Sequence, residues 1–327
     1  MKPLEGCLVL DFSTLLPGPL ATLLLAEAGA EVVTIARPGA GELPWLGQLN
    51  RGKQRLVLDL KEPRDRQRLK PLVERADVLV EQFRPGVMGR IGLGYDEVAA
   101  INPKIVYCSI TGYGQHGPKS GVAGHDLNYI ADTGLLSLSM GTPSNPVIPP
   151  ALMADIAGGS YPAVINILLA LRERDRTGRG RHLDVSMTDN LFTLMIGSPV
   201  ITSGGARYRL YATKDGRMLA VGALEQKFWD AFCDIANLEP PLRDDARDPH
   251  ATAARVAELV AGETAETWAR RIAGRDCCCS IVTSVDEAMR DPHFVARGLF
   301  RHQVAREDGD VIPALPVPID PAFRADP

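Results

Sequence analysis

Short apolar segments alternate with helix-like segments through the first half of the 327-residue chain, and this pattern permits few folds. The expected strands are Cys7–Asp11, Glu31–Ala36, Arg55–Leu60, Asp77–Phe83 and Lys104–Thr111. Between them, Pro17-Gly18-Pro19 opens one helix, because proline fits the first helical turn. Apolar strands that alternate with helices are typical of a parallel sheet covered on both faces. The sequence therefore predicts a Rossmann-like α/β domain.

Two longer helical patterns follow, from about His125 to Leu138 and from Asp155 to Arg174. The second ends with cations in its last turns and a glycine at Gly178, as helix C-termini commonly do. The segment His182–Asp189 either resumes the sheet or begins the next helix. Around Ile201–Arg209 the composition becomes rich in Gly and Ser, which indicates a linker.

A smaller α+β domain is expected beyond this linker. A hairpin pairs Leu210–Tyr211 with Met218–Val221 around the turn Lys214-Asp215-Gly216. Short helices are expected at Gln226–Ala236, Ala251–Ala261 and Thr264–Ala273. The Pro-rich tail is predicted to be extended and to return to the first domain. A chain of this length exceeds one comfortable core. The predicted division is a large domain over 1–200, a small domain with its linker over 201–310, and a tail over 311–327.

Composition excludes several classes of protein. A net charge of −4 gives no basic footprint for nucleic acid. No window supplies about 18 uninterrupted apolar residues, so we expect no membrane span, and the N-terminal segment lacks the pattern of a secretion signal. The six cysteines, including Cys277-Cys278-Cys279, form neither a paired framework nor a metal-binding CxxC motif. Reduced, mostly buried thiols in a cytoplasmic protein are therefore predicted.

Three acid–base residues begin helix-like runs or close a strand, namely His125, Asp155 and Glu225. Removal of a proton from carbon requires a base against the substrate, and inversion requires a second base on the opposite face. A histidine and an aspartate that both open helices could serve as this pair. Each also has an ordinary explanation, since a single histidine is often structural and an N-terminal aspartate is often only a cap.

Four cations, Arg37, Lys61, Arg84 and Arg90, lie just beyond predicted strands or in a helix that begins there. Ligands bind at this edge of open α/β sheets, and cations there suit a phosphate-bearing molecule. Scattered surface charge is the alternative for any one of them. The segment Gly112–Gly117 matches GxGxxG, but no helix follows it at once and its strand is not the first of the unit. A nicotinamide dinucleotide is therefore not expected.

Several motifs in this order resemble the family III CoA-transferase superfamily over nearly the whole chain. They are Leu4-Glu5-Gly6 with Asp11 and Pro17-Gly18-Pro19, Asn50-Arg51-Gly52-Lys53, Phe83-Arg84-Pro85-Gly86, Thr111-Gly112-Tyr113-Gly114 with Gly117-Pro118, and Thr177-Gly178-Arg179-Gly180. Within the superfamily, Gly124-His125-Asp126-Leu127-Asn128-Tyr129 and Gly222-Ala223-Leu224-Glu225 are most similar to the α-methylacyl-CoA racemases.

This resemblance implies a reversible proton shift at C2 of a 2-methylacyl-CoA thioester, which interconverts the R and S forms through an enolate. His125, supported by Glu225, would be one acid/base and Asp155 the other. Backbone N–H groups at the helix opened by Asp155 are expected to hold the enolate oxygen, with Gly158 and Gly159 allowing close approach. No metal ion and no redox cofactor are implied, because the thioester carbonyl takes the developing charge.

The resemblance also implies how coenzyme A and the subunits are arranged. CoA enters as part of the substrate, its phosphates near Arg37, Lys61, Arg84 and Arg90, with Asp59 and Leu60 beside the nucleotide. The implied assembly is an interlocked homodimer with shared active sites, so that Glu225 comes from the partner subunit. A role in lipid and fatty acid metabolism follows from the expected substrate.

Two alternatives stay open at this point. Transferases of the superfamily use an aspartate at the position of Asp155 as a nucleophile, through an acyl anhydride and an enzyme–CoA thioester. Three departures count against transfer: His125, Glu225 in place of an Asn-Asp pair, and no run of glycines near residues 220–265. The other alternative is an acyl-CoA-binding subunit without turnover.

Overall fold

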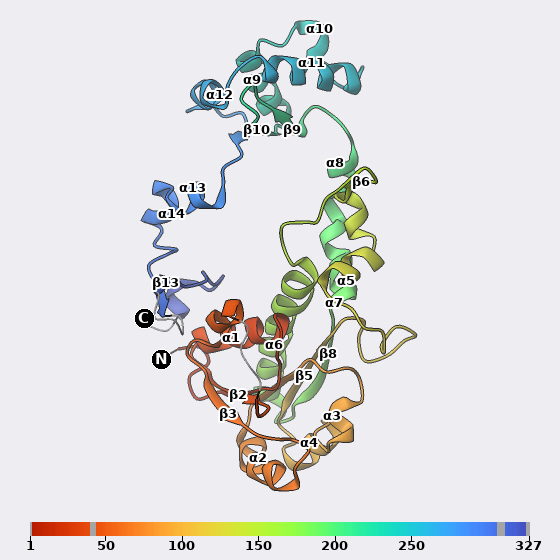
Figure 1. Cartoon of the computed structure of the whole chain (residues 1–327), viewed down its shortest axis with the longest axis vertical. Coiled ribbons are helices and arrows are strands. Elements are labelled where there is room, and N and C mark those ends of the chain that lie inside the picture. The colour runs from red at the N-terminus through yellow and green to blue at the C-terminus, as the bar shows by residue number, and fades with distance from the viewer. Residues whose placement is uncertain (1, 40–43, 306–310, 325–327) are drawn as a thin grey trace. The chain divides into compact units, whose positions relative to one another are not determined.

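The structure is a computed structural model that describes residues 2–39, 44–305 and 311–324. Its backbone contacts divide the chain into two units (Figure 1). Unit 1 comprises Met1–Met195 and Gly298–Pro327, and unit 2 comprises Ile196–Arg297. The sequence places these boundaries near residue 200 and residue 311.

Unit 1 contains a six-stranded parallel sheet in the order β3-β2-β1-β4-β5-β8. Its strands are β1 (Leu8–Asp11), β2 (Glu31–Ala36), β3 (Gln54–Val57), β4 (Val78–Glu81), β5 (Val106–Thr111) and β8 (Arg181–Ser186). The predicted α/β fold with a parallel sheet is confirmed. β8 also decides the open question at residue 182, since the chain resumes the sheet before α7 (Met187–Leu191) begins. The strand order reverses between β1 and β4, where ligands bind in open sheets of this kind.

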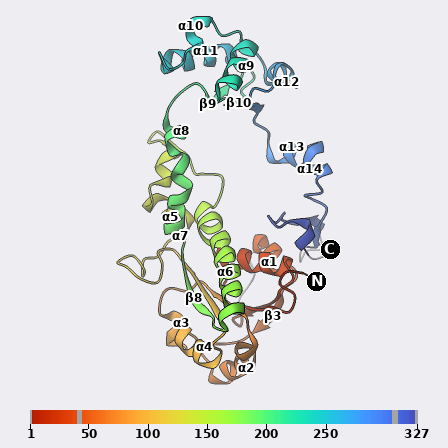
Figure 2. The same ribbon diagram turned by 180° about the vertical axis from the view of Figure 1, so that it is seen from behind.

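Helices cover both faces of this sheet (Figure 1 and Figure 2). They are α1 (Pro17–Glu27), α2 (Pro63–Arg75), α3 (Val87–Arg90), α4 (Tyr95–Ile101) and α6 (Tyr161–Thr177). Successive side chains of a strand point to opposite faces. Val9 of β1 therefore packs in a cluster with residues of α1 and α6. Its neighbours Leu8 and Leu10 pack in a cluster with Leu69 and Val73 of α2 and with residues of α3 and α4.

The segment before α6 folds differently from the prediction at one point. A single helix was expected from about His125 to Leu138, but α5 (Asp126–Asp132) ends before the 3₁₀ helix η2 (Leu135–Leu138). Gly134 separates them with φ of 83°, a left-handed conformation that glycine adopts at helix ends. Shorter elements complete this unit's first segment: η1 (Pro44–Asn50), β6 (Gly141–Thr142) and β7 (Asn145–Pro146).

A wide helical turn, η3 (Ala154–Ser160), runs directly into α6. It is a π-helix, in which the N–H of Tyr161 bonds to the carbonyl of Ile156 five residues back. Ala154–Thr177 together is the one helix, within the part of the chain that the structure describes, with the length and mean hydropathy (1.4) of a membrane span. Its residues Ala163 and Ile167 pack in the core of unit 1, and 44% of its apolar window is buried.

Unit 2 is a small α+β unit with an antiparallel sheet in the order β11-β10-β9. The strands are β9 (Tyr208–Ala212), β10 (Met218–Gly222) and β11 (Cys279–Ile281). The helices are α9 (Gln226–Ala236), α10 (Pro240–Arg243), α11 (Pro249–Ala261), α12 (Ala265–Ile272), α13 (Val285–Met289) and α14 (Pro292–Ala296). The predicted hairpin is present as β9 and β10. Trp229, Phe232 and Trp268 pack in the core of unit 2, where the rings of Phe232 and Trp268 stack.

The cysteine run does not lie wholly in this core. Cys277 is buried and Cys279 is half-buried in β11, but Cys278 is exposed with a positive φ of 50°. Cys278 precedes β11 in a left-handed backbone conformation, which is uncommon for a residue other than glycine. The prediction of buried packing is therefore wrong for Cys278. All six cysteines are free thiols.

The junction between the units and the C-terminal tail contains short elements. They are η4 (Phe192–Gly197), α8 (Ser198–Thr202), β12 (Gln303–Ala305), β13 (Val311–Pro313) and η5 (Pro321–Phe323). The tail packs on α1, because Val317 lies in one apolar cluster with Leu20 and Leu24. The Leu315 carbonyl also accepts from the Arg51 guanidinium at 3.0 Å.

Candidate active site

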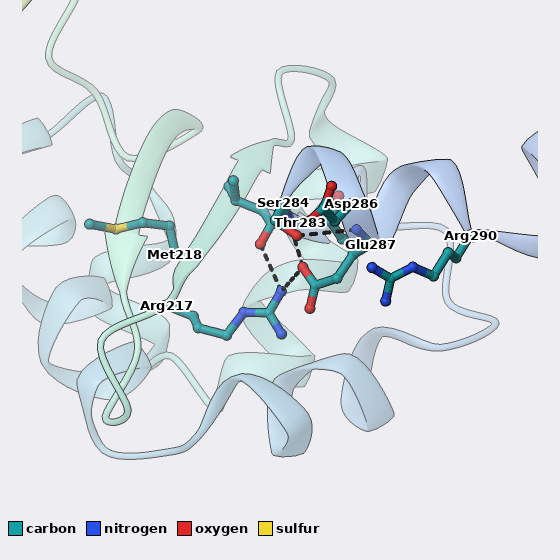
Figure 3. A pocket seen from close by; sticks show the side chains of 8 residues that line it. Arg217, Met218, Thr283, Ser284, Asp286, Glu287 and Arg290 are labelled. Atoms are coloured by element: carbon teal, nitrogen blue, oxygen red, sulfur yellow. Dashed lines mark hydrogen bonds and ion pairs between the residues drawn. The ribbon is translucent and has the colours of Figure 1, made fainter. Parts of the chain in front are cut away.

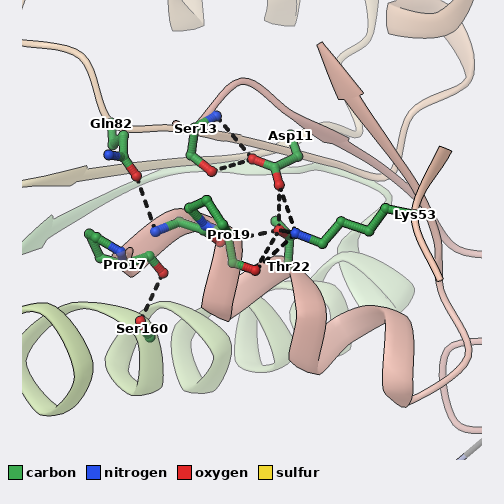
Figure 4. A network of polar contacts seen from close by, with 9 residues as sticks. Asp11, Ser13, Pro17, Pro19, Thr22, Lys53, Gln82 and Ser160 are labelled. Carbon is green, nitrogen blue, oxygen red and sulfur yellow. Dashed lines mark hydrogen bonds and ion pairs between the residues drawn. The ribbon is translucent and has the colours of Figure 1, made fainter. Parts of the chain in front are cut away.

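A buried polar network lies where β1 ends and α1 begins (Figure 4). The ammonium of Lys53 lies 3.2 Å from the Asp11 carboxylate and donates to the hydroxyl of Thr22 at 2.7 Å and to the carbonyl of Pro19 at 2.9 Å. The hydroxyls of Ser13 and Thr22 also donate to Asp11. Both charged side chains are almost fully buried. Two residues of the family motifs, Asp11 and Lys53, therefore stabilise the fold near the carboxyl edge of the sheet.

Two further hydrogen bonds tie the beginning of α1 to its neighbours (Figure 4). The N–H of Gly18 donates to the side-chain carbonyl of Gln82, just after β4, at 3.1 Å. The hydroxyl of Ser160, in η3, donates to the carbonyl of Pro17 at 2.8 Å. The turn at Pro17-Gly18-Pro19, the end of β4 and the helix with Asp155 are thus held together at this edge.

His125 and Asp155 are brought together through Asp126, the first residue of α5. His125 is the N-cap of α5, and its N–H donates to Asn128 at 3.1 Å. The next residue, Asp126, is 5% exposed, and its carboxylate accepts the backbone N–H of Asp155 at 2.9 Å. It also accepts the N–H groups of Ala154 and Met153. One carboxylate therefore joins the start of α5 to the start of η3, and with it the two predicted acid–base residues.

The environment of Asp155 changes its protonation. Burial and, after it, the charge of Asp126 raise the pKa of Asp155 from 3.8 to about 6, while His125 acts in the opposite direction. A buried carboxyl beside a like charge is expected to hold its proton more tightly. A group that titrates near pH 6 can both accept and donate a proton near neutrality, which general acid–base catalysis requires.

Tyr129 connects this pair to one predicted cation. Its ring is buried, and its hydroxyl donates to the carbonyl of Gly124 at 2.6 Å. Burial raises the pKa of Tyr129, Asp155 adds to this rise, and Arg84 opposes it. Arg84 and Asp155 thus both face the same phenol, so the loop after β4 lies beside the acid–base pair.

The predicted oxyanion hole at the start of η3 is wrong. The N–H groups of Met153, Ala154 and Asp155 are already bound by Asp126. The two glycines are needed for protein packing: a Cβ on Gly158 would lie 2.5 Å from the carbonyl oxygen of Met187, and one on Gly159 would lie 3.0 Å from Cβ of Pro17. Neither glycine leaves space for a ligand at its α-carbon.

The predicted CoA-binding residues lie at the carboxyl ends of three strands. Arg37 follows β2; Asp59, Leu60 and Lys61 follow β3; Arg84 follows β4; and Arg90 ends α3. The side chains of the four cations are exposed, and none makes an ion pair or hydrogen bond with any residue that the structure describes. Neighbouring strands lie about 4.8 Å apart, so β3 and β4, three steps apart, end roughly 14 Å from each other. The cations are thus free to bind an extended polyanion.

Glu225 belongs to unit 2, where it is the N-cap of α9, three residues after the last residue of β10. Its side chain is exposed and lies near Cys278. The pKa of the Cys278 thiol is raised, first by desolvation and then by the Glu225 carboxylate. Within its unit, therefore, Glu225 is an accessible carboxylate at a strand end.

A shallow hollow of about 640 Å³ in unit 2 contains none of the predicted residues (Figure 3). The Arg217 guanidinium there donates to Glu287 at 3.1 Å and to the carbonyl of Val282 at 3.0 Å, so its charges are largely satisfied. Residues 2–39, 44–305 and 311–324 contain no cluster of three His, Cys, Asp or Glu side chains that could hold a metal ion.

Sequence reasoning missed the role of Asp126. In the sequence, Asp126 is only an acidic residue of the motif that contains His125, which is compatible with any first-turn aspartate. The pairing with Asp155 spans 29 residues of sequence. No local pattern indicates which helix such a carboxylate caps.

Comparison with known proteins identifies the family of this chain. The chain matches the model of CoA-transferase family III over residues 4–323. It belongs to this family and is an enzyme of the superfamily of CoA-transferases and racemases that the family represents. The predicted family is thus confirmed.

Racemases and CoA-transferases are about equally similar to this chain. Alpha-methylacyl-CoA racemase of Homo sapiens is 35% identical over 99% of this chain and 90% of its own length. Succinyl-CoA:glutarate CoA-transferase of Mus musculus is 36% identical over 76% and 62%, respectively. Succinate--glutarate CoA-transferase of Agrobacterium fabrum is 32% identical over 97% and 89%. The chain therefore shares its family with enzymes of both kinds.

Solved structures show the same architecture. Rv3272 from Mycobacterium tuberculosis superposes with a TM-score of 0.86 at 28% identity, over 99% of this chain and 94% of that one. A CAIB/BAIF family protein from Brucella suis has the same fold, with a TM-score of 0.79 at 24% identity, over 98% and 93%.

Proposed function

We propose that this enzyme is a racemase that interconverts the R and S forms of a 2-methylacyl-CoA thioester. The observation that carries this proposal is the pair His125 and Asp155, joined by the carboxylate of Asp126. The Asp155 carboxyl has a pKa of about 6, raised by burial and by Asp126. Inversion at carbon by two bases needs such a pair of groups that exchange protons near neutrality.

In the proposed mechanism, the Asp155 carboxylate removes the proton from C2 on one face of the substrate. The electron pair of the C–H bond moves into the thioester to form an enolate. The protonated imidazole of His125 then delivers a proton to C2 on the opposite face. The reverse reaction exchanges the two roles, and the imidazolium also stabilises the adjacent negative charge. Glu225 supports His125.

Transfer of CoA is the second candidate. A nucleophilic carboxylate must be ionised to attack a thioester, and so must a base that removes the α-proton, so the raised pKa of Asp155 fits both reactions. His125, joined to Asp155 through Asp126, supplies the second acid/base that inversion needs and so favours proton transfer over an acyl anhydride. The 35% identity to a racemase over nearly the whole chain agrees with this choice.

Coenzyme A is proposed to bind as part of the substrate at the carboxyl edge of the sheet. Exposed cations without a partner among the described residues would contact its phosphates, with Asp59 and Leu60 beside the nucleotide; these cations are Arg37, Lys61, Arg84 and Arg90. The Asp59 carboxylate accepts the N–H of Lys61 at 3.0 Å, which shapes this loop. No metal ion or redox cofactor is required, because the thioester carbonyl takes the charge of the enolate.

The active form is proposed to be a homodimer in which Glu225 reaches the site of the partner subunit. Support comes from apolar side chains on unit 1 that stay exposed: Ile165 at 57% and Leu169 at 62% on α6, and Phe192 at 61%. Clustered exposed apolar residues mark protein contacts. A cytoplasmic location fits the free cysteines, and the substrate would place the enzyme in lipid and fatty acid metabolism.

The deciding experiment incubates an enantiopure 2-methylacyl-CoA in heavy water and follows both chirality and label at C2. The native enzyme should racemise the substrate and introduce deuterium without an acyl acceptor. His125→Ala and Asp155→Ala should each lose roughly a hundred- to ten-thousand-fold in rate, while calorimetry shows unchanged binding of CoA. His116→Ala and Asp189→Ala are matched controls, since both side chains are exposed.

Other outcomes would support the competing functions. An acyl-enzyme trapped by hydroxylamine at Asp155, with transfer of CoA to a free acid, would establish a transferase. Tight binding of acyl-CoA with no isotope exchange would establish a binding subunit. Normal racemisation by Asp155→Ala would refute the proposed mechanism.

A further inference from the structure

Asp126 is a buried carboxylate whose charge has no cation partner among the described residues. It is 5% exposed, and no lysine or arginine in the described part of the chain pairs with it. Burial raises its pKa, while the three backbone N–H groups that it accepts, from Met153, Ala154 and Asp155, act to lower it. Backbone donors at the start of a helix stabilise a negative charge. Asp126 thus caps a helix, η3, that begins 28 residues further along the chain.

We propose that Asp126 is a positioning residue of the active site, an inference that rests on the proposed function. Asp126 accepts the Asp155 N–H at 2.9 Å and directly follows His125 in sequence. It therefore sets the position of Asp155 relative to His125. It also keeps a negative charge beside the Asp155 carboxyl. Asp126 does not touch the reacting carbon. It acts through His125 and Asp155, the two bases on opposite faces of that carbon.

A purely structural cap would not explain why a negative charge lies beside the Asp155 carboxyl. The Asp155 donor is an uncharged backbone N–H, so a neutral side-chain acceptor at position 126 could fix the geometry equally well. The charge matters only if a titratable group lies next to it, and Asp155 does. The two carboxyls share a buried site, where like charges disfavour the ionised form of each. Asp126 therefore tunes the group that exchanges the proton.

The other groups around Asp155 are few. On α5 it is faced by His125, which acts against Asp126, and by Tyr129, whose phenol is in turn faced by Arg84. On α7, the charged residue is Asp189, which is exposed. The helix α1 meets η3 through the carbonyl of Pro17, an uncharged group. Asp126 is the buried carboxylate among these groups. Removal of its charge should therefore change the pKa of Asp155 more than removal of the exposed Asp189 would.

The test uses Asp126→Asn in the full-length enzyme. Asparagine keeps an oxygen that can accept the Asp155 N–H but removes the charge. The pKa of Asp155 should then fall, so the acidic limb of kcat/KM should move to lower pH by about one unit, the size of a typical effect of one close charge. The limb belongs to the His125–Asp155 pair as a whole, so it should move equally for both substrate enantiomers.

A second measurement is independent of catalysis. Carbon-13 NMR of aspartate-labelled protein gives the titration of the Asp155 carboxyl, assigned by comparison with Asp155→Asn. Its midpoint should fall in Asp126→Asn. It should stay in place in the control Asp132→Asn, an exposed aspartate at the other end of α5 that binds Lys119 and Tyr113.

The two measurements separate the possible failures. A lower NMR midpoint in an enzyme that exchanges no α-proton would leave the role of Asp126 intact and refute the racemase proposal. An unchanged midpoint in Asp126→Asn would overturn the inference whatever the activity. Asp126→Ala, which removes the acceptor as well, should lose more activity than Asp126→Asn when both are folded by circular dichroism. Equal losses would contradict the positioning role.

Discussion

Glu81 makes the stability of unit 1 depend on pH. It is the last residue of β4, is 4% exposed, and accepts the N–H of Phe83 at 2.8 Å and the hydroxyl of Ser109. Burial outweighs these two hydrogen bonds and raises the pKa of Glu81 from 4.5 to about 7. Ser109 in turn bonds to the ring of His182 at 2.9 Å. No lysine or arginine in the part of the chain that the structure describes pairs with the Glu81 carboxylate.

The sign of the effect follows from proton binding. Between pH 4.5 and about 7, Glu81 binds a proton in the folded protein but loses it on unfolding. The free energy of unfolding therefore decreases as pH rises through this range and becomes constant above it. A pKa difference of about 2.5 units corresponds to about 3 kcal/mol, at 1.36 kcal/mol per unit. This is a large part of the stability of an ordinary domain.

Glu81→Gln tests this reasoning. Glutamine keeps an oxygen for the Phe83 N–H and offers an amide to Ser109, but it carries no charge. Its stability relative to the native enzyme should increase by about 3 kcal/mol between pH 4 and pH 8. Urea-dependent hydrogen exchange of the β4 and β5 amides measures this, because those amides report on unit 1. Glu74→Gln, at an exposed position on α2, is the matched control. A difference between Glu81→Gln and native enzyme that does not vary with pH would refute the assignment.

Two further substitutions test the polar network at the start of α1. Gly18→Ala should destabilise the enzyme by about 1–3 kcal/mol or more in urea unfolding, because the new Cβ would lie 2.1 Å from Cβ of Ser13. Gly47→Ala should change little, since nothing lies within 4 Å of the corresponding position. Lys53→Met should cost about 3–5 kcal/mol by removing one partner of a buried ion pair. The addition of Asp11→Asn should restore part of this loss in a double-mutant cycle, and full additivity would contradict the pairing.

Much of the fold follows from local patterns in the sequence. β2 spans the predicted Glu31–Ala36, and α1 begins at the predicted Pro17. Apolar runs and helix-opening prolines determine these elements within a few residues, so no knowledge of the tertiary structure was needed. The break at Gly134 was missed because the apolar spacing continues across it, and only the backbone angle shows that the helix ends.

The candidate site was less accessible to prediction, for a physical reason. His125 and Asp155 could be proposed from their positions at helix starts, but their proximity depends on a hydrogen bond between segments far apart in sequence. The glycines at 158 and 159 illustrate the same limit. A glycine leaves space for a ligand or for another part of the protein, and only the position of Met187 decides between them.

The π-helical turn of η3 limits how the length of this segment can change in the enzyme. The turn places Asp155 one hydrogen-bonding step out of phase with the α-helix that continues from Tyr161. Deletion of a single residue between them would yield a more regular helix. It would also rotate the carboxylate by about 100° around the axis, the angle of one α-helical step, and so turn it away from Asp126. In this segment, insertions and deletions are therefore more damaging than most substitutions, and length is the property that selection must preserve.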